Sequence, residues 1–177
     1  MKASILVLLL TLTSGTPGAQ ALAQESNESQ VKAAYLFNFA KFVEWPSEAF
    51  NDSGEPIIVG VVGEDSTSSA IDQTINGKTA NGRRLLIKRF PNFKAITRCH
   101  ILFISSSQRD NLGQILAAAG PAVLTIGETE RFAQMGGIIN FTIIDNKLRF
   151  EINPTAAERA GLRISAKLLS LARVIRN

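Results

Sequence analysis

The strongest constraint on the fold is an alternation of apolar runs with helical segments between residues 56 and 128. The run "PIIVGVVG" at 56–63 is apolar throughout, which is typical of a parallel strand covered on both faces. Three further strands are predicted at "RLLIKRF" (84–90), "RCHILFISS" (98–106) and "AVLTIGE" (122–128), with helices between them at 66–77 and 108–120 and a short helical turn at 128–135. Strands that alternate with helices favour an α/β layer with a mainly parallel sheet.

The C-terminal part follows a different pattern. "GIINFTII" and "KLRFEIN" flank Asp145-Asn146, a dipeptide suited to a type I′ hairpin turn. That turn pairs Phe141 with Phe150 on an apolar face and Asn140 with Glu151 on a polar face. A helix is then expected from Asn153-Pro154 to Gly161, and Ser165 can cap a last one. The predicted fold is a single α/β domain whose mostly parallel sheet is flanked by helices, with a C-terminal antiparallel hairpin and a terminal helix.

The N-terminus has the pattern of an export signal. Lys2 precedes an apolar run at residues 5–12, and Ala21-Leu22-Ala23 is a small-x-small cleavage pattern. The run is too short to cross a bilayer, which takes about 20 residues. We therefore expect a signal peptide at 1–23 cleaved near Ala23, a flexible segment at 24–30, a domain at 31–177, and a periplasmic location in a bacterial source.

The first segment of the domain is unusually apolar. In "KAAYLFNFAKFVEWP" (32–46) the polar residues Asn38, Lys41 and Glu44 recur at every third position, and most of the remaining circumference is apolar. A helix over 31–43 that covers the sheet is expected, and Pro46 ends it. The function predicted for this helix is packing first and recognition second.

Composition excludes several classes of function. The chain has 177 residues, 45% of them hydrophobic, which suits a globular core and argues against disorder. Its net charge of +4 comes from scattered Lys and Arg, so nucleic acid is not an expected partner. Cys99 is the only cysteine, so no intramolecular disulfide is possible, and its thiol is either buried or paired between molecules.

Residues that could carry chemistry are few. His100 is the only histidine and lies in a predicted strand, where it and Cys99 point to opposite faces and cannot share a metal ion. No metal-ligand motif such as CxxC or HExxH occurs. The pairs Glu64/Asp65 and Glu128/Glu130 are interpreted as solvated acids at helix starts. We therefore expect no catalytic residues, no metal and no cofactor.

Two surfaces remain as binding candidates. On the hairpin, Asn140, Arg149 and Glu151 share the polar face. They could serve a partner by strand addition or side-chain docking if the hairpin lies at the sheet edge, or could simply be satisfied and solvated. Near Ser165, Arg163 and Lys167 could hold a small carboxylate, although surface cations at a helix start are more often only solvated.

Four motifs in order resemble the YfiR-like family of periplasmic regulatory proteins. They are "KAAYLFNFAKFVEWP", "CHILFISSS", "VLTIGETERFAQMGGIINFTIIDNKLRFEIN" and "AAERAGLRISAKLLSLARVI", and the resemblance covers residues 31–175. It implies a homodimeric α/β protein without catalytic residues that represses an inner-membrane diguanylate cyclase by binding its periplasmic sensor part. Repression lowers cyclic-di-GMP and biofilm formation, and a peptidoglycan-associated outer-membrane lipoprotein can titrate the repressor. The family's repressor has two internal disulfides, which a chain with one cysteine cannot form.

The resemblance also suggests site residues. The hairpin matches the region implicated in cyclase contact, which makes Phe141, Phe150 and Glu151 candidate partner-facing residues, although both phenylalanines share a face that could instead be core. The "FVEWP" turn and "GLRIS" match areas implicated in small-ligand binding, which points to Glu44, Trp45 and Arg163. The alternative function is therefore a periplasmic small-molecule binding module that reports to a membrane sensor kinase.

Overall fold

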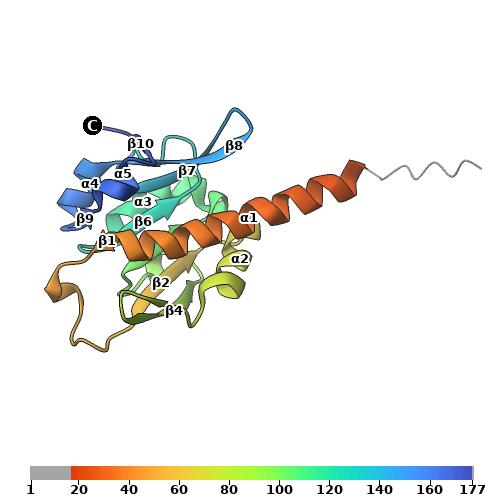
Figure 1. Cartoon of the computed structure of the whole chain (residues 1–177). Helices are drawn as coiled ribbons and strands as arrows, with labels where there is room; N and C mark the ends of the chain where they lie inside the picture. Colours follow the sequence, from red (N-terminus) through yellow and green to blue (C-terminus); the bar gives the residue numbers. More distant parts are fainter. Residues whose placement is uncertain (1–16, 177) are drawn as a thin grey trace, which may run out of the picture.

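The computed structural model describes residues 17–176, and side chains from Gln24 onward, as an α/β domain around an eight-stranded sheet (Figure 1). The strand order is β10-β8-β7-β6-β5-β2-β4-β3. The strands are β2 (Ile57–Val62), β3 (Thr79–Ala80), β4 (Arg83–Phe90), β5 (Ile101–Ile104), β6 (Leu124–Gly127), β7 (Ile139–Ile144), β8 (Lys147–Ile152) and β10 (Arg173–Val174).

The central part of this sheet is parallel, as predicted. Strands β4, β2, β5, β6 and β7 are neighbours in that order and run parallel, whereas β8 pairs antiparallel with β7. If these five strands are numbered 1 to 5 along the chain, their order across the sheet is 2-1-3-4-5. This is a doubly wound arrangement, in which ligands bind at the carboxyl ends of the strands. The chain crosses from β4 over to β5 beside β2, so the switch point lies between β2 and β5.

Helices cover both faces of the sheet. They are α1 (Pro17–Phe42), α2 (Ser66–Ile75), α3 (Leu112–Ala118), α4 (Pro154–Arg159) and α5 (Ala166–Leu169). One core lies between the sheet and α1, α2, α4 and α5, with Leu36, Phe39 and Phe103 fully buried in it. A smaller core on the other face packs α3 against the sheet through Leu112 and Ile115. The apolar first helix is thus a core helix, and its polar positions Asn38 and Lys41 are exposed.

The structure differs from the expected boundaries at the N-terminus. Residues 24–30, predicted to be flexible, are helical and belong to α1. Ser29 is 3% exposed and donates to Ser66 Oγ at 2.8 Å, and Glu28 pairs with Lys32 one turn later at 2.7 Å, so tertiary and i,i+4 contacts order this polar stretch. The export signal falls largely on residues 1–16, outside the described residues; its cleavage pattern lies in the first turns of α1. No helix in the described range is long and apolar enough to span a membrane.

The C-terminal end also differs from expectation. Ser165 caps α5 as predicted, accepting from Leu168 N at 3.2 Å, but the helix ends at Leu169. The chain then extends into β10, where Arg173 lies beside Glu151 of β8. Residues 128–135, expected as a short helical turn, form consecutive turns, and Phe132 is fully buried among them.

A second, two-stranded sheet joins the two ends of the domain. Strand β1 (Val43–Glu44) directly follows α1 and pairs antiparallel with β9 (Arg163–Ile164). The pairing places Glu44 opposite Arg163. The sequence alone gave no indication of this contact.

The hairpin register matches the prediction at every pair. Phe141 lies opposite Phe150 and Asn140 opposite Glu151. Asp145 and Asn146 both have positive φ, 50° and 55°, as a type I′ turn requires. The hairpin rises beyond the body of the domain at the upper right of Figure 1.

Candidate interaction site

The aromatic face of the hairpin belongs to the core. Phe141 and Phe150 are 3% and 4% exposed, and their rings lie 5.8 and 5.2 Å from the ring of Phe39 in α1. In the isolated chain the two rings thus differ from the partner-facing expectation and take the core alternative, and their contact with a partner stays a prediction. Packing against α1 explains the difference, because removing such rings from water is worth several kcal/mol in all.

The polar face of the hairpin is more buried than its composition suggests. Asn140 is 3% exposed and Glu151 6% exposed, and Glu151 meets Arg173 Nη1 at 3.3 Å. The side-chain carbonyl oxygen of Asn140 has no hydrogen-bond partner among the described residues. Arg149, in contrast, is exposed. The register puts Asn140, Arg149 and Glu151 on one face of the hairpin as predicted, with Arg149 at its exposed end.

Asn140 and Glu151 contribute to a hollow of about 400 Å³, which we call the polar hollow. It lies where β6 ends, between α1, the β6–β7 loop and the hairpin. Its lining residues are Lys32, Glu128, Glu130, Arg131, Gln134, Asn140, Phe141, Thr142, Ile143, Leu148 and Glu151. The hollow therefore combines charged groups from three elements with an apolar rim at the hairpin.

A buried charge cluster forms one wall of the polar hollow. Glu128, at the carboxyl end of β6, accepts from Lys32 Nζ at 2.8 Å and from Thr67 Oγ1 at 3.1 Å. The Lys32 and Glu128 side chains are only 13% and 8% exposed. The expectation that Glu128 is a solvated acid is thus wrong, because α1 covers it and supplies its cation.

Asp65 completes this cluster from the carboxyl end of β2. The Asp65 side chain caps α2, because its Oδ1 accepts a hydrogen bond from Ser68 N at 2.7 Å. Its other oxygen, Oδ2, is buried and has no hydrogen-bond partner among the described residues. Burial and the neighbouring Asp65 raise the pKa of Glu128. Burial also acts to raise the pKa of Asp65, but a hydrogen bond from Glu128 and further donors outweigh it and lower that pKa. Glu128 is therefore the weaker acid of the two.

Sequence reasoning missed this cluster because its members are far apart in the chain. Each acid directly follows a strand, and the carboxyl ends of parallel strands meet at one edge of a sheet. The predicted order of strands would have placed Asp65 and Glu128 at that edge. Nothing in the sequence could have indicated that Lys32 joins them.

The four residues predicted for a small ligand do not line a common cavity in this structure. Glu44 and Arg163 lie opposite each other on β1 and β9, and Lys167 Nζ lies 5.4 Å from the ring centre of Phe42. Trp45 Nε1 donates to the carbonyl oxygen of His100 at 3.2 Å. Their neighbours Pro46 and Gly161 instead line a cleft of about 820 Å³ at the amino ends of the strands.

His100, which lines this cleft, has a structural role. Its Nδ1 accepts from Ile58 N at 3.0 Å, and its Nε2 donates to the Ala49 carbonyl oxygen at 3.0 Å. The ring stacks on Phe50 at 4.5 Å, and burial lowers its pKa. Both ring nitrogens are used by the backbone, so the histidine stays neutral and offers no free nitrogen to a substrate.

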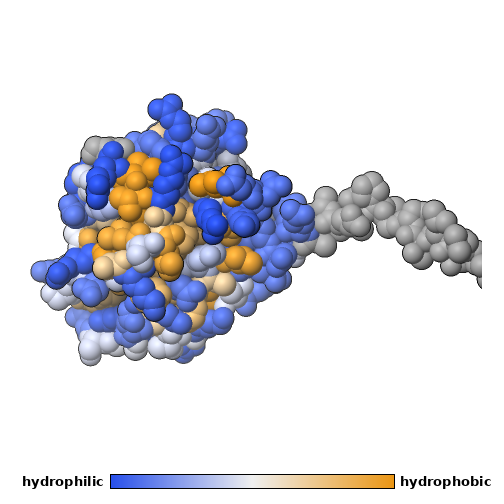
Figure 2. Space-filling model, turned by 45° about the horizontal axis from the view of Figure 1, so that its top comes forward, coloured by the Kyte–Doolittle hydropathy of each residue, from blue (hydrophilic) through white to orange (hydrophobic). Residues whose placement is uncertain are grey.

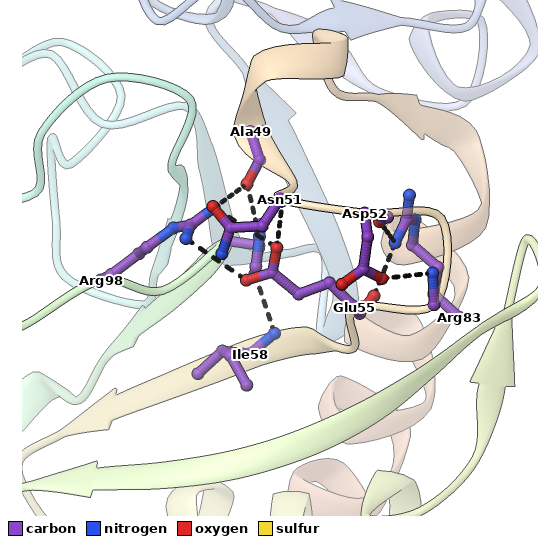
Figure 3. Close-up of polar contacts among 9 residues, drawn as sticks. Ala49, Asn51, Asp52, Glu55, Ile58, Arg83 and Arg98 are labelled. Atoms are coloured by element: carbon purple, nitrogen blue, oxygen red, sulfur yellow. Dashed lines mark hydrogen bonds and ion pairs between the residues drawn. The ribbon is translucent and has the colours of Figure 1, made fainter.

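Two arginines hold the loop over this cleft (Figure 3). Arg98 donates to the Ala49 carbonyl oxygen at 2.7 Å and pairs with Glu55 at 3.4 Å. Arg83 donates to the carbonyl oxygens of Asp52 and Glu55 at 3.0 and 2.7 Å. These contacts fix the 49–55 loop from both sides, so the cleft is preformed.

Apolar surface is also present on the face that carries α5, β10 and the hairpin. Figure 2 shows hydrophobic groups gathered there between polar ones. Leu171 and Ile143 are exposed large apolar side chains, at 67% and 51%. Among the described residues, no group of three or more His, Cys, Asp or Glu is arranged to hold a metal ion.

Comparison with known proteins agrees with this fold. A solved structure of a conserved domain protein from Vibrio cholerae O1 biovar El Tor matches with a TM-score of 0.51 and 14% identity, over 68% of this chain and 54% of that chain. This chain thus spans about half the length of that protein, and the likeness concerns the fold alone. A domain from Streptococcus pneumoniae, described as an ABC domain in complex with L-Trp, matches at a TM-score of 0.49 and 10% identity, over 67% and 55%.

Sequence comparison identifies the family directly. The profile described as YfiR/HmsC-like matches residues 29–173. That range begins in α1, includes both binding candidates and ends in β10. The chain therefore belongs to the YfiR/HmsC-like family.

Proposed function

We propose that this protein is a periplasmic repressor that binds the periplasmic sensor part of an inner-membrane diguanylate cyclase. Its family suggests periplasmic regulation of cyclic-di-GMP signalling, and the match over residues 29–173 is the observation that carries the proposal. Repression of the cyclase would lower cyclic-di-GMP and with it biofilm formation. A peptidoglycan-associated outer-membrane lipoprotein that removes the repressor, and a homodimeric state, belong to the same proposal.

The chemistry of the domain supports a docking role. The single histidine is committed to backbone hydrogen bonds, which argues against histidine-based catalysis. The polar hollow and the protruding hairpin offer a partner both charged and apolar groups on a fixed scaffold. A regulator that works by contact needs such a surface and no reacting group.

Gene deletion and affinity purification test this proposal. Deletion should raise cellular cyclic-di-GMP and biofilm mass, and the tagged protein expressed in its own host should retain the cyclase. Complementation with the unmodified gene should restore the lower level. Unchanged cyclic-di-GMP after deletion, together with no cyclase in the purified fraction, would reject the repressor function.

The 820 Å³ cleft favours a second candidate function, a small-molecule binding module that reports to a sensor kinase. Its volume lies within the range of small-ligand pockets. Trp45, the only tryptophan, touches His100 at the cleft wall and is therefore a built-in reporter. Its fluorescence should change saturably during titration with amino acids and small anions, whereas a flat response across that panel would remove the support for this function.

A further inference from the structure

The end of the parallel sheet leaves part of β7 without a neighbour. Strand β6 pairs with β7 only at Ile139 and Asn140. Strand β7 continues for four more residues, to Ile144, and among the described residues no strand pairs with it there on the β6 side. We call this unpaired edge, together with the polar hollow beside it, the edge slot.

The hairpin register shows which backbone groups face the edge slot. The two-residue turn makes Ile144 and Lys147 a hydrogen-bonded pair, and such pairs alternate along an antiparallel hairpin. Two backbone hydrogen bonds near the base of the hairpin agree with this alternation of bonded and non-bonded pairs. Asn153 N donates to Ile138 O at 2.9 Å across the hairpin, whereas Ile152 O points away from β7 and accepts from Ile175 N at 2.8 Å. Ile143 and Leu148 are therefore a pair that does not exchange hydrogen bonds. Ile143 turns its N–H and C=O toward the slot, and Leu148 turns its own toward the opposite edge.

An unpaired strand edge beside a hollow has the form of a strand-addition site. Main-chain hydrogen bonds to such an edge supply affinity, and pockets for alternate side chains supply specificity. Strand β7 contains no proline that would prevent pairing at this edge, and Ile143 there is 51% exposed. A second hollow of about 310 Å³ shares Ile143 and Leu148 and extends the surface to Val31 of α1.

The lining of the polar hollow favours a basic side chain. Glu128, Glu130 and Glu151 line the hollow beside Lys32 and Arg131. Glu128 already meets Lys32 and Glu151 already meets Arg173, which leaves Glu130, among the described residues, as the carboxyl group without an ion pair of its own at this site. The buried carbonyl oxygen of Asn140 lacks a donor and lies in this lining. An arginine or lysine brings donors and positive charge, and its aliphatic stem can pack on Ile143 and Leu148.

We propose that the edge slot binds an extended segment of a partner protein, which adds to the sheet beside β7 and places an arginine or lysine side chain in the polar hollow. That the partner is a cyclase sensor part rests on the proposed function. The strand addition itself rests on the unpaired edge and on the acceptors in the hollow.

Binding of a synthetic probe tests the slot without the natural partner. The probe is a fluorescent, capped hexapeptide of alternating threonine and valine with one central arginine, and its control has citrulline in that position. On titration, the amide of Ile143, which faces the slot, should shift in NMR spectra of the protein. The citrulline peptide should bind about tenfold more weakly, because it loses the charge-assisted hydrogen bonds.

Two proline variants provide matched controls. Ile143→Pro removes an N–H that faces the slot, and Val174→Pro removes an outward N–H of the edge strand β10, which lines neither hollow. Only the first should weaken peptide binding. A peptide with N-methyl groups on alternate residues, added to the unmodified protein, should also fail to bind and requires no substitution in the hairpin.

Several outcomes would overturn the proposal. These are no saturable binding of the arginine peptide, shifts confined to another edge such as β4, or full binding of the N-methylated peptide. A dimer that dissociates on Ile143→Pro would assign the slot to a second copy of this chain. If the Ile143→Pro variant still retains the cyclase, the edge slot is rejected as the docking site and the proposed function stands. If the protein binds the peptide but never contacts a cyclase, the slot stands and the proposed function is rejected.

Discussion

Lys32 is the cation that pairs with the buried Glu128 between α1 and the sheet, so Lys32→Met should lower the free energy of unfolding substantially. Methionine keeps most of the apolar stem and removes the ammonium group. The Glu128 carboxyl, 8% exposed, would then lie next to Asp65 without its cation. Removing one partner of a buried ion pair leaves an uncompensated charge, which is strongly destabilising.

The magnitude follows from the burial of this pair. A fully buried pair that loses one partner costs about 3–5 kcal/mol, and the residual exposure of Lys32 and Glu128 places this case near 3 kcal/mol. In a domain of this size each kcal/mol lowers Tm by roughly 2–4 °C, so a decrease of about 6–12 °C is expected. Glu28→Gln is the control, because Glu28 is 37% exposed and its i,i+4 pair with Lys32 contributes only about 0.3–0.5 kcal/mol.

The pH dependence has a definite sign. Because burial and Asp65 raise the pKa of Glu128, the folded state keeps its proton when the unfolded chain has lost it. Stability from this group is full below its unfolded pKa and is lost as pH rises through the folded pKa. The cost of Lys32→Met should therefore be large at pH 7 and small at pH 4, where Glu128 is protonated and needs no cation.

Urea unfolding followed by circular dichroism at both pH values measures this cost. The double variant Lys32→Met/Glu128→Gln should recover most of the loss at pH 7, because it removes the charge together with its partner. Equal costs for Lys32→Met and Glu28→Gln, or a Lys32→Met cost that does not change between pH 7 and pH 4, would refute the reasoning about this cluster.

Other predictions concern the remainder of the domain. Gly137→Ala places a Cβ against the ring of the fully buried Phe132 and should destabilise the fold by about 1–3 kcal/mol. Gly113→Ala meets open space in α3 and should stabilise the fold by about 0.5–1 kcal/mol. Thermal unfolding of both variants measures the two changes. Burial raises the pKa of Cys99 to about 11, so at pH 8 a thiol reagent should label it only after unfolding, and labelling of the folded protein at the rate of a free thiol would contradict its burial. His100→Gln should lower Tm through the lost contacts to Ile58 and Ala49, with the folded variant still able to bind the arginine peptide; loss of that binding alone would show a role that the geometry does not predict.

The sequence predicted the parts of the fold that depend on local pattern. Continuous apolar runs identified the central strands, and Asp145-Asn146 set the hairpin register to the residue. The predicted helix starts at Asn153 and Ser165 are also confirmed, since each side chain accepts a backbone N–H of the helix that follows. These features have short-range causes that are visible in a single stretch of sequence.

Features that depend on distant contacts were not predictable. The helical state of residues 24–30 depends on Ser66, and the burial of Glu128 depends on Lys32, which lies 96 residues away. The β1–β9 contact joins two-residue strands that no periodicity can mark. The burial of Phe141 was left open for the same reason, because only the position of α1 decides which face of the hairpin is covered.

Cyclic-di-GMP in a deletion strain, complemented with either Ile143→Pro or Val174→Pro, tests the central claim most directly. The claim is that this domain regulates by docking a partner segment at the edge of β7. Both variants should accumulate as folded protein, but only Val174→Pro should return cyclic-di-GMP to the level of the unmodified gene. Equal restoration by both variants would contradict docking at this edge, and a deletion that leaves cyclic-di-GMP unchanged would contradict the regulatory function itself.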